Sequence, residues 1–387
     1  MLVARALPVI LRKAGASLDQ IGAVYLVLFP WALKFLWAPL VDRFNFASLG
    51  RYRSSLLVLH SVLVVGVVAL SCVDFTHFLL HRQHIAIPAL AALTIVSATA
   101  DTASHGLAVN LLGERERGPG NGVQTAGMMT GSLIGGGLVL VLVDWIGWQG
   151  AMLAMAGMIL LPIIAVWRHN EPFLRESTRF GLRDVLLVFK GRGILRWFVA
   201  LAMIGATSNL VAAPMEALLV DRGLELTEIG VVLGVLGSAA GIAGGLVGGL
   251  AVRRLGRRTG FYTLGVVSVL GLVPLAVVAE GPTSRGPLYA AVLVAQFGTT
   301  AVCTILYTMM MDRSRGHLAS SDYTVQYSVL ELAGFSGMTI GGWTAGLLGM
   351  RRLFLMAPLT ILLALLGTAR LLRAVDFRPA TNDQGES

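Results

Sequence analysis

Charged residues are scarce in this chain. They make up 13% of its 387 residues, against about 25% in a typical soluble domain. Hydrophobic residues account for 56%, and the mean hydropathy is +0.76. A soluble protein could not cover so much apolar surface. Apolar segments of about 20 residues recur along the whole chain, which is the length that crosses a bilayer core of about 30 Å. The sequence therefore predicts a multi-pass membrane protein and argues against a soluble enzyme.

Cysteine and the common catalytic motifs are also rare or lacking. Cys72 and Cys303 are the only two cysteines, and both lie in apolar stretches, so the sequence indicates neither a disulfide framework nor a metal site. The phosphate-binding pattern G-x-x-x-x-G-K-[ST] does not occur, so this chain encodes no ATP-driven pump. His77, His81 and His84 lie in a loop that offers no supporting carboxylates. We expect no enzyme, no cofactor and no resident metal.

The net charge of +9 is spread over short connections between apolar segments. Lys and Arg are about three times as frequent after the even-numbered segments as after the others, and the positive-inside rule makes that side cytoplasmic. Membrane topology thus explains the charge, and we expect no nucleic-acid partner. The C-terminus is predicted to be cytoplasmic.

One signature occurs twice. The segments 15–22 and 223–230 both follow the pattern G-x-x-L-x-x-I-G, with a constant offset of 208 residues. Each copy opens a long apolar segment that ends in a basic turn. A chain whose second half repeats its first is typical of transporters built from two structural repeats.

We predict an all-α protein of two six-helix repeats. An N-terminal bundle covers 1–167, a cytoplasmic linker 168–193, a C-terminal bundle 194–374 and a polar tail 375–387. The predicted helices cover 1–12, 20–41, 54–73, 86–112, 120–143, 148–167, 194–219, 228–251, 260–279, 287–311, 323–348 and 353–373.

The first predicted helix is shorter than its counterpart in the second repeat. A dozen residues reach about 18 Å, which is less than the bilayer core. The segment before Gly223, in contrast, is a full apolar helix that starts near Ile194. We therefore expect the first helix to be truncated in this sequence, most simply through a start codon placed too far downstream. A natural half-spanning or re-entrant helix is the alternative.

Ionisable side chains inside apolar helices usually face a cavity, because each costs at least a few kcal/mol at the bilayer centre. Asp101 lies midway along the fourth predicted helix, and Ser97 and His105 are one turn away on the same face. A carboxylate beside an imidazole can exchange a proton near neutral pH; a structural hydrogen-bonded pair is the alternative. Lys34 either extends to the cytoplasmic interface or faces the cavity, where it could pair with Asp101 or with an anionic ligand.

Polar residues of both halves complete the candidate sites. The proton-coupling candidates are Asp101, His105, Glu216 and Glu331. The substrate-cavity candidates are Lys34, Trp31, Asn209, Gln124, Tyr307 and Gln326. Candidates for a gate that opens and closes with access are Asp42, Arg43, Arg51, Arg253, Arg254, Arg257, Asp312 and Arg313, with cytoplasmic anchoring charge as the alternative.

Glycines at spacings of three to four residues follow Gln124 and Gln326 in the fifth and eleventh predicted helices. Small residues at such spacings allow two helices to approach closely. We therefore expect packing and hinge positions at Gly127, Gly131 and Gly135, and at Gly334, Gly337 and Gly341.

The two basic turns resemble the signature loop of the major facilitator superfamily, G-x-x-x-D-R/K-x-G-R-R/K. The first copy has Ala38 in the leading glycine position and a longer spacer before Gly50-Arg51. The second has Arg253-Arg254 where the acid is expected. Within that superfamily, the segments 7–22 and 30–43 resemble the RhtX/FptX siderophore importers and, more distantly, the AmpG-type muropeptide permeases. The segments 306–315 and 322–326, and Asp101 followed by 106–109, favour the resemblance to the siderophore importers.

This resemblance implies a major facilitator fold and import by alternating access. The expected function is proton-driven uptake of an iron–siderophore complex through the bacterial inner membrane by a monomer, with the lipid bilayer, protons and a small-molecule substrate as partners. A muropeptide permease and a drug or metabolite exporter are the alternatives. Exporters of this superfamily often carry a Gly-Pro element in the fifth helix. The segment from Gly127 to Gly137 contains no proline, so this resemblance weighs against export.

Overall fold

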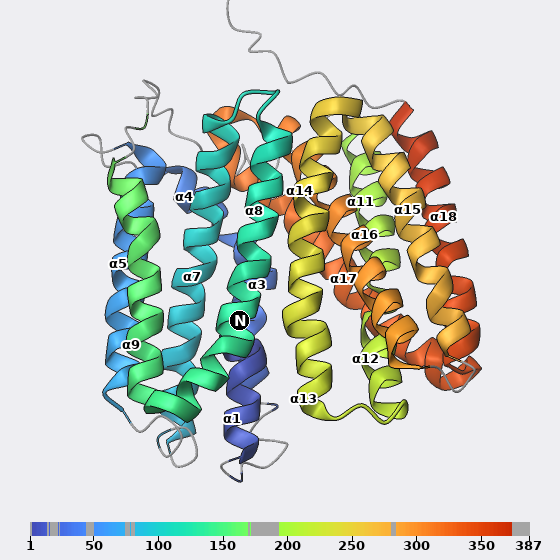
Figure 1. Ribbon diagram of the computed structural model, residues 1–387. Coiled ribbons are helices and arrows are strands. Elements are labelled where there is room, and N and C mark those ends of the chain that lie inside the picture. The colour runs from blue at the N-terminus through green and yellow to red at the C-terminus, as the bar shows by residue number, and fades with distance from the viewer. Residues whose placement is uncertain are drawn as a thin grey trace, which may run out of the picture. The chain divides into compact units, whose positions relative to one another are not determined.

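The fold is entirely helical in the residues that the structure describes. The computed structural model describes residues 2–13, 15, 22, 24–43, 50–73, 78, 82–168, 171, 193–279 and 284–373, and all regular elements in these ranges are helices (Figure 1). Eight helical runs among them are long and apolar enough to cross a membrane. The prediction of an all-α, multi-pass membrane protein is confirmed. The linker from 172 to 192 and the tail after 373 lie outside the described residues.

The chain forms two compact units. Unit 1 comprises 1–111, 131–185 and 316–324, and unit 2 comprises 112–130, 186–315 and 325–387. Each unit therefore contains a short segment from the other half of the sequence. The division into two bundles at the central linker stays a prediction.

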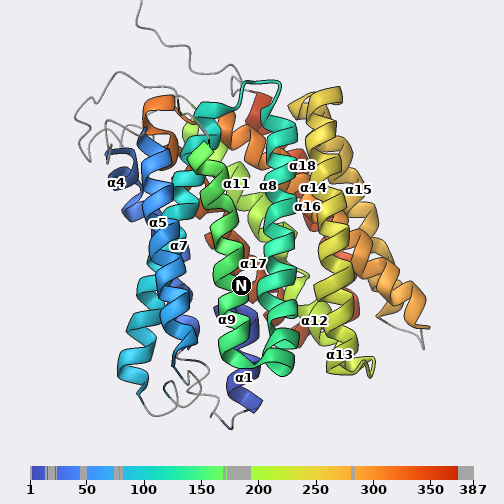
Figure 2. The same cartoon turned by 60° about the vertical axis from the view of Figure 1, so that its left-hand side comes forward.

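Unit 1 is built around α5 (Arg51–Ser71), which packs against both α7 (Gln83–Leu111) and α9 (Val139–Arg168). α5 and α7 run side by side in two views of the molecule (Figure 1 and Figure 2). The other elements of this unit are η1 (Leu2–Ala6), α1 (Leu7–Lys13), η2 (Leu26–Leu28), α3 (Phe29–Leu33), η3 (Lys34–Leu36), α4 (Ala38–Arg43), η4 (Leu133–Leu138) and η7 (Gly316–Leu318).

Unit 2 is built around α16 (Arg285–Asp312), which packs against α14 (Gly237–Leu255) and α15 (Arg257–Val278). α18 (Met350–Arg373) packs against α15 and α11 (Ile194–Asn209). The remaining elements are α12 (Ala212–Asp221), α13 (Leu226–Ile229), η6 (Gly230–Leu236) and most of α8 (Arg117–Ser132). α17 (Ala319–Leu348) begins in unit 1 and continues in unit 2.

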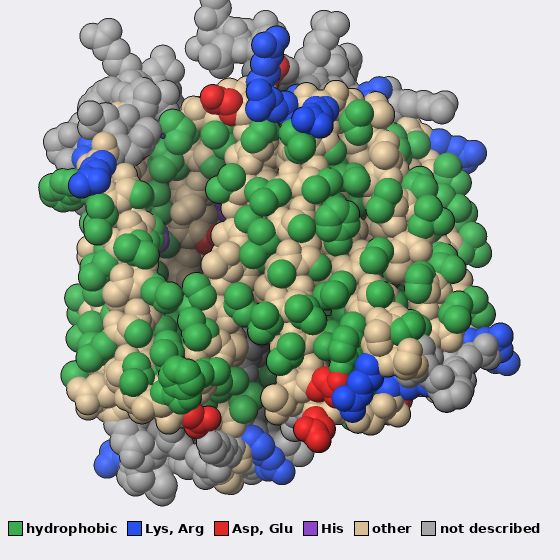
Figure 3. Space-filling view, viewed as in Figure 1, with side chains coloured by type: hydrophobic (Ala, Val, Ile, Leu, Met, Phe, Trp, Pro, Cys, Tyr) green, Lys and Arg blue, Asp and Glu red, His purple; other side chains and the backbone are tan. Residues whose placement is uncertain are grey.

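The surface of the helices is that of a protein immersed in lipid. Hydrophobic side chains cover the outward faces of the helices, and charged side chains gather near the helix ends (Figure 3). Leu347 and Trp145, for example, remain 85% and 80% exposed. Contiguous apolar surface of this kind is covered by hydrocarbon in a membrane protein, so the exposure needs no partner protein.

Three pairs of glycines confirm the internal repeat. The first glycines of the two signature copies, Gly15 and Gly223, have φ angles of +87° and +72°. The glycines of the basic turns, Gly50 and Gly256, have φ angles of +88° and +79°. The last pair, Gly147 and Gly349, follows at the predicted turns between helices five and six and between helices eleven and twelve, with +71° and +87°. Only glycine adopts this left-handed conformation without steric cost, so the two halves share their turns.

The described part of the predicted helix 20–41 is helical but irregular. From Leu26 onward it consists of the short pieces η2, α3, η3 and α4. Pro30 and Pro39 lie near the starts of α3 and α4, where proline can begin a helix but cannot continue one, because it has no N–H to donate. Pro214 has the same effect on the predicted helix 194–219, which is interrupted between Asn209 and Ala212.

The packing prediction for the glycines is confirmed in the second half. A Cβ at Gly337 would lie 2.0 Å from the carbonyl oxygen of Ala206, and one at Gly341 would lie 1.8 Å from that of Leu210. α17 therefore rests directly on the backbone of α11. Gly127 and Gly131 have no neighbouring atom within 4 Å of a Cβ, so they do not serve close packing in this structure.

Candidate functional site

Three predicted ionisable residues meet inside unit 1. The Lys34 Nζ donates a hydrogen bond to the Asp101 Oδ2 at 2.5 Å, and the His105 Nε2 lies 3.2 Å from the same oxygen. The Lys34 and His105 side chains are 0% and 4% exposed, whereas 30% of the Asp101 side chain is exposed. We call these three residues the ion cluster. Its cation is buried and its carboxylate reaches an opening.

Two aromatic rings flank the ion cluster. The Lys34 Nζ lies 4.9 Å from the centre of the Trp31 ring, a cation–π contact. The Tyr323 ring stacks on His105 with centroids 4.3 Å apart and an angle of 30° between the planes. Tyr323 comes from the first turns of α17, so a residue from the second half of the sequence completes a site in the first.

The breaks at the two prolines position the ion cluster. Lys34 begins the tight turn η3 between α3 and α4, and the Trp37 Nε1 after that turn donates to the Thr99 Oγ1 of α7 at 3.0 Å. Asp101 and His105 lie one turn apart on α7 and therefore share a face. A continuous helix would have carried Lys34 past α7 without this anchoring contact. The predicted pairing of Lys34 with Asp101 is thus present.

The charge balance of the ion cluster relates protonation to anion binding. Lys34 and Asp101 form a neutral pair when His105 is uncharged, and one added proton leaves the cluster with a net positive charge. Such a charge is costly away from water unless an anion joins it or the site opens. Protonation and anion binding are therefore favourable together.

A pocket in unit 2 collects three more of the predicted residues. Asn209 of α11, Tyr307 of α16 and Glu331 of α17 line a cavity of about 70 Å³, and Cys303 lies in its wall. The Asn209 side-chain amide also donates to the Gly205 carbonyl at 3.0 Å. Because a water molecule takes up about 30 Å³ of liquid, this pocket has room for a small polar group and not for a whole substrate.

The other polar candidates lie in different surroundings. The Gln326 side chain is 2% exposed; it accepts a hydrogen bond from the Trp197 Nε1 at 2.7 Å and donates to the Met310 carbonyl at 3.2 Å. Gln124 is half-buried in α8, and Glu216 is exposed on α12. Among the described residues, no three His, Cys, Asp or Glu side chains are grouped so that they could hold a metal ion.

Asp42, the acid of the first basic turn, accepts hydrogen bonds at the start of α17. Its carboxylate accepts the Ser320 and Ser321 backbone N–H groups at 3.1 and 2.8 Å, the Ser321 hydroxyl at 2.5 Å and the Tyr52 hydroxyl at 2.6 Å. The first N–H groups of a helix have no partner within it, so Asp42 caps α17 from another helix. Burial raises the pKa of Asp42, and the hydrogen bonds from Ser321 and Tyr52 oppose that rise.

Arg51 adds a second bond between the same parts of the chain. Its Nη1 donates to the His317 carbonyl at 3.1 Å. Asp42, Tyr52 and Arg51 thus join the first basic turn to the segment 317–321 of the second half. We call these residues the first gate.

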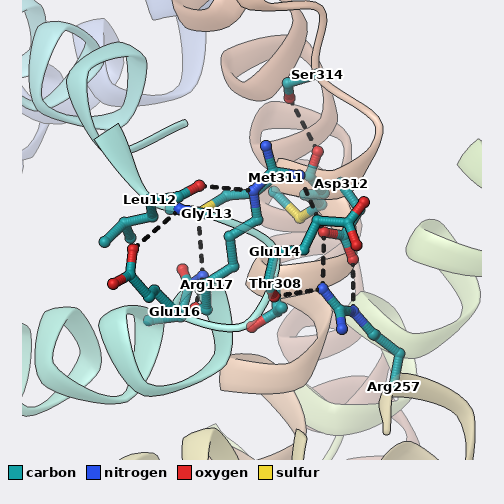
Figure 4. Close-up of polar contacts among 12 residues, drawn as sticks. Leu112, Gly113, Glu114, Glu116, Arg117, Arg257, Thr308, Met311, Asp312 and Ser314 are labelled. Atoms are coloured by element: carbon teal, nitrogen blue, oxygen red, sulfur yellow. Dashed lines mark hydrogen bonds and ion pairs between the residues drawn. The ribbon is translucent and has the colours of Figure 1, made fainter. Parts of the chain in front are cut away.

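Asp312 forms the centre of a second ionic group, in unit 2. The Arg117 Nη1 lies 3.0 Å from one carboxylate oxygen, and the Arg257 Nε lies 2.9 Å from the other. The Arg257 Nη2 donates to the Glu114 carbonyl at 2.8 Å, and both arginines reach Asp312 in the close-up view (Figure 4). Arg117 and Glu114 belong to the first half of the sequence, Arg257 and Asp312 to the second. We call this group the second gate.

A sequence comparison identifies the family. The family model described as "Major Facilitator Superfamily" matches residues 1–337. The chain belongs to the major facilitator superfamily. This membership explains the two repeats, the two basic turns and the helical fold together, and it makes the protein a membrane transporter.

Relatives of this facilitator include a permease and a protein named as a transporter. The anhydromuropeptide permease of Escherichia coli K12 is 29% identical over 308 residues, which cover 76% of this chain and 61% of that protein. The matched part thus spans less than two thirds of the permease. A Rickettsia conorii protein that bears the name AmpG 4 is 23% identical over 385 residues, covering 93% and 89% of the two chains.

A solved structure shares the facilitator fold. It is the crystal structure of a bacterial homologue of the iron transporter ferroportin in an outward-facing state, with a TM-score of 0.60, 14% sequence identity and 91% coverage of both chains. At this identity the likeness shows the fold alone. The predicted major facilitator fold is confirmed by both comparisons.

The arginines that the sequence predicts as gate residues differ in their contacts. Arg51 and Arg257 make the bonds of the two gates, whereas Arg43, Arg253 and Arg254 are exposed. Asp312 pairs with Arg117 and Arg257, while the guanidinium of its neighbour Arg313 lies 5.0 Å from the centre of the Trp197 ring.

Sequence reasoning found Arg51 and Arg257 but missed the other partners in the two gates, Arg117, Tyr52 and Ser321. Arg117 lies in the alternating segment Glu114-Arg115-Glu116-Arg117. It differs from Arg115 only in being the first residue of α8, which the sequence does not reveal. Tyr52 and Ser321 belong to no sequence motif that would identify them as partners of Asp42. Tyr323 lies in the segment 322–326, which resembles the siderophore importers. Its stacking on His105 depends on how α17 packs on α7, so the sequence alone does not predict that contact.

Proposed function

We propose that this protein is a proton-coupled importer of a muropeptide-like substrate, an amino sugar that carries a short peptide. The ion cluster is the observation that supports coupled transport. Three ionisable groups in the membrane-spanning part are expensive to keep, and they are retained where they bind ions or substrates. The name of the Escherichia coli relative, an anhydromuropeptide permease, supports the substrate class.

The chemistry of the ion cluster fits an anionic ligand. A peptide carboxylate can take the place of Asp101 beside Lys34 once Asp101 or His105 has gained a proton. The exposed edge of Asp101 is where ligand and proton arrive, because Lys34 and His105 are almost fully buried. The Trp31 and Tyr323 rings offer flat apolar faces, on which sugar rings can stack. Loss of the proton on the cytoplasmic side restores the Lys34–Asp101 pair and expels the ligand.

The two gates supply the other half of the proposed cycle. Each joins a segment of the first sequence half to a segment of the second, and each lies within one compact unit. The positive-inside pattern assigns the basic turns that carry the gates to the cytoplasmic side. We infer that the gates hold the transporter closed toward the cytoplasm and release when the loaded protein opens inward.

Siderophore import is the rival that the sequence alone favoured. The name of the Escherichia coli relative favours a muropeptide over a siderophore as the substrate. Both substrates enter from the periplasm, so direction of transport does not separate them and the ligand itself has to be varied.

The test measures uptake of each ligand by the purified protein in proteoliposomes. Radiolabelled anhydromuropeptide is supplied outside vesicles with an alkaline interior, in parallel with a ferric hydroxamate siderophore. We expect accumulation of the muropeptide that a protonophore abolishes, and no accumulation of the siderophore. Accumulation of the siderophore alone would show that the substrate is a siderophore and not a muropeptide. Uptake that the protonophore does not reduce would refute proton coupling.

A further inference from the structure

A groove on unit 2 lies apart from the ion cluster, the pocket and both gates. It has a volume of about 430 Å³ and runs between the first turns of α15 and the last turns of α18. Arg258, Tyr262 and Val266 line it from α15, and Leu362, Leu366 and Ala369 line it from α18. We call it the α15–α18 groove. Its volume falls in the range of about 300–1,000 Å³ that is typical of ligand sites.

The shape of the groove follows from small residues where the two helices meet. A Cβ at Gly265 would lie 2.8 Å from the Leu365 Cδ2, so α18 can approach α15 closely at this level. Val266 and Leu366 stand on the outer walls and are 46% and 56% exposed. Ala369 carries only a methyl group, which leaves the groove open toward Arg258.

The groove has the depth of one leaflet. Arg258 and Val266 are eight residues apart on α15, and at a rise of 1.5 Å per residue this corresponds to about 12 Å. Half of a hydrocarbon core of about 30 Å is about 15 Å. An acyl chain that starts at Arg258 would therefore stay beside apolar side chains for most of its leaflet.

The charges at the polar end favour an anionic headgroup. Arg258 lines the groove, while its neighbour Arg257 is bonded to Asp312 of the second gate. α15 starts and α18 ends on the same side of unit 2 (Figure 1). Exposed arginines stand nearby, in the last turn of α14 just before α15 and after Ala369 of α18: Arg253, Arg254 and Arg370. Each such cation near a membrane surface attracts anionic lipid by about fivefold in affinity.

We propose that the α15–α18 groove binds one anionic phospholipid of the cytoplasmic leaflet. One acyl chain lies between Val266 and Leu366, and the headgroup phosphate lies at Arg258. Tyr262 stands one turn below Arg258, at the depth where amphipathic aromatic rings meet the lipid interface. This site depends on the protein's place in the membrane and not on its substrate.

The test compares two lipids with the same acyl chains on the purified, detergent-solubilised protein. Native mass spectrometry measures the apparent affinity for dioleoyl phosphatidylglycerol, which is anionic, and for dioleoyl phosphatidylcholine, which is neutral. The variants are Arg258→Gln, which removes the cation, and Ala369→Trp, which fills the groove. Arg352→Gln is the matched control, because it also removes one exposed arginine, but at the end of α18 that lies away from the groove.

We expect the wild type to prefer phosphatidylglycerol and Arg258→Gln to lower that affinity roughly fivefold while phosphatidylcholine binding stays unchanged. Ala369→Trp should weaken both lipids, and Arg352→Gln should match the wild type. Equal binding of the two lipids to the wild type would overturn the proposal, as would Arg258→Gln behaving like Arg352→Gln. A mass of two copies that Ala369→Trp reduces to one would also overturn it, since the groove would then be a self-association surface. If Ala369→Trp does not fold, the comparison of Arg258→Gln with Arg352→Gln decides.

Discussion

At the scale of single residues, the proposed proton coupling depends most on the pair Lys34 and Asp101. The Lys34 side chain has no exposed surface, and it pairs with a carboxylate that is partly exposed. Removing one partner of a buried pair leaves an uncompensated charge, which is strongly destabilising, whereas replacing both partners by neutral groups can be almost neutral. Stability and transport should therefore respond differently to changes in this pair.

Lys34→Gln should lower stability by about 1–3 kcal/mol, a value reduced from the full cost of a broken buried pair because Asp101 is partly exposed. Adding Asp101→Asn to that variant should restore most of the lost stability, because no charge is then left unpaired. The apparent melting temperature in one detergent, measured for both single variants and the double variant, checks this. Asp221→Asn on the exposed end of α12 is the control for the carboxylate change. A double variant as unstable as the sum of the single variants would contradict the pairing.

Sequence reasoning found the members of the ion cluster but not its geometry. Charged side chains in apolar segments are conspicuous, so Lys34, Asp101 and His105 were each identified as candidates. The contact of Lys34 with Asp101 requires the turn η3. The contact of Tyr323 with His105 requires that α17, more than 200 residues later in the sequence, packs on α7. Contacts of this kind depend on tertiary packing, which leaves no local pattern.

At the scale of elements, glycine decides how α17 lies on α11. Gly341 touches the Leu210 carbonyl, whose usual hydrogen-bond donor is missing because residue 214 is proline. The next residue, Gly342, has no neighbouring atom within 4 Å of a Cβ. Two adjacent glycines of one helix thus give a matched pair of sites.

Gly341→Ala should destabilise the protein by about 1–3 kcal/mol, because the methyl group overlaps the backbone of α11 and forces the helices apart. Gly342→Ala should be neutral or stabilising by up to about 1 kcal/mol, because alanine favours the helix and meets nothing. Thermal unfolding of the two variants beside the wild type checks both. Equal shifts for the two alanines would show that the close approach of α17 to α11 does not matter for stability.

Helix positions were largely predictable, and helix interruptions were not. The periodic apolar runs gave α5, α7, α15 and α16 within a few residues of their ends. The run 20–41 is equally apolar, yet Pro30 and Pro39 divide it, and the sequence offers no measure of how far a proline in a membrane helix will be tolerated. The cap that Asp42 provides to α17 shows the same limit, because the donor groups are backbone N–H groups of a distant helix.

At the scale of the whole molecule, the repeat is the most reliable inference from sequence. The matched signature glycines predicted two halves, and the paired left-handed glycines bear this out in the backbone. The same comparison draws attention to the differences between the halves. The first half holds the ion cluster, the second holds the polar pocket, and the two gates use different acids, Asp42 and Asp312.

Proton coupling through Asp101 is the central claim, and substrate-induced proton movement tests it most directly. Wild-type protein and Asp101→Asn are placed in separate proteoliposomes without a pH gradient, and external pH is followed with a dye after anhydromuropeptide is added outside. We predict that the outside becomes alkaline with the wild type, since protons enter with substrate, and that Asp101→Asn gives no pH change although it still exchanges labelled for unlabelled substrate. An equal alkalinisation with a correctly inserted Asp101→Asn protein would contradict the account.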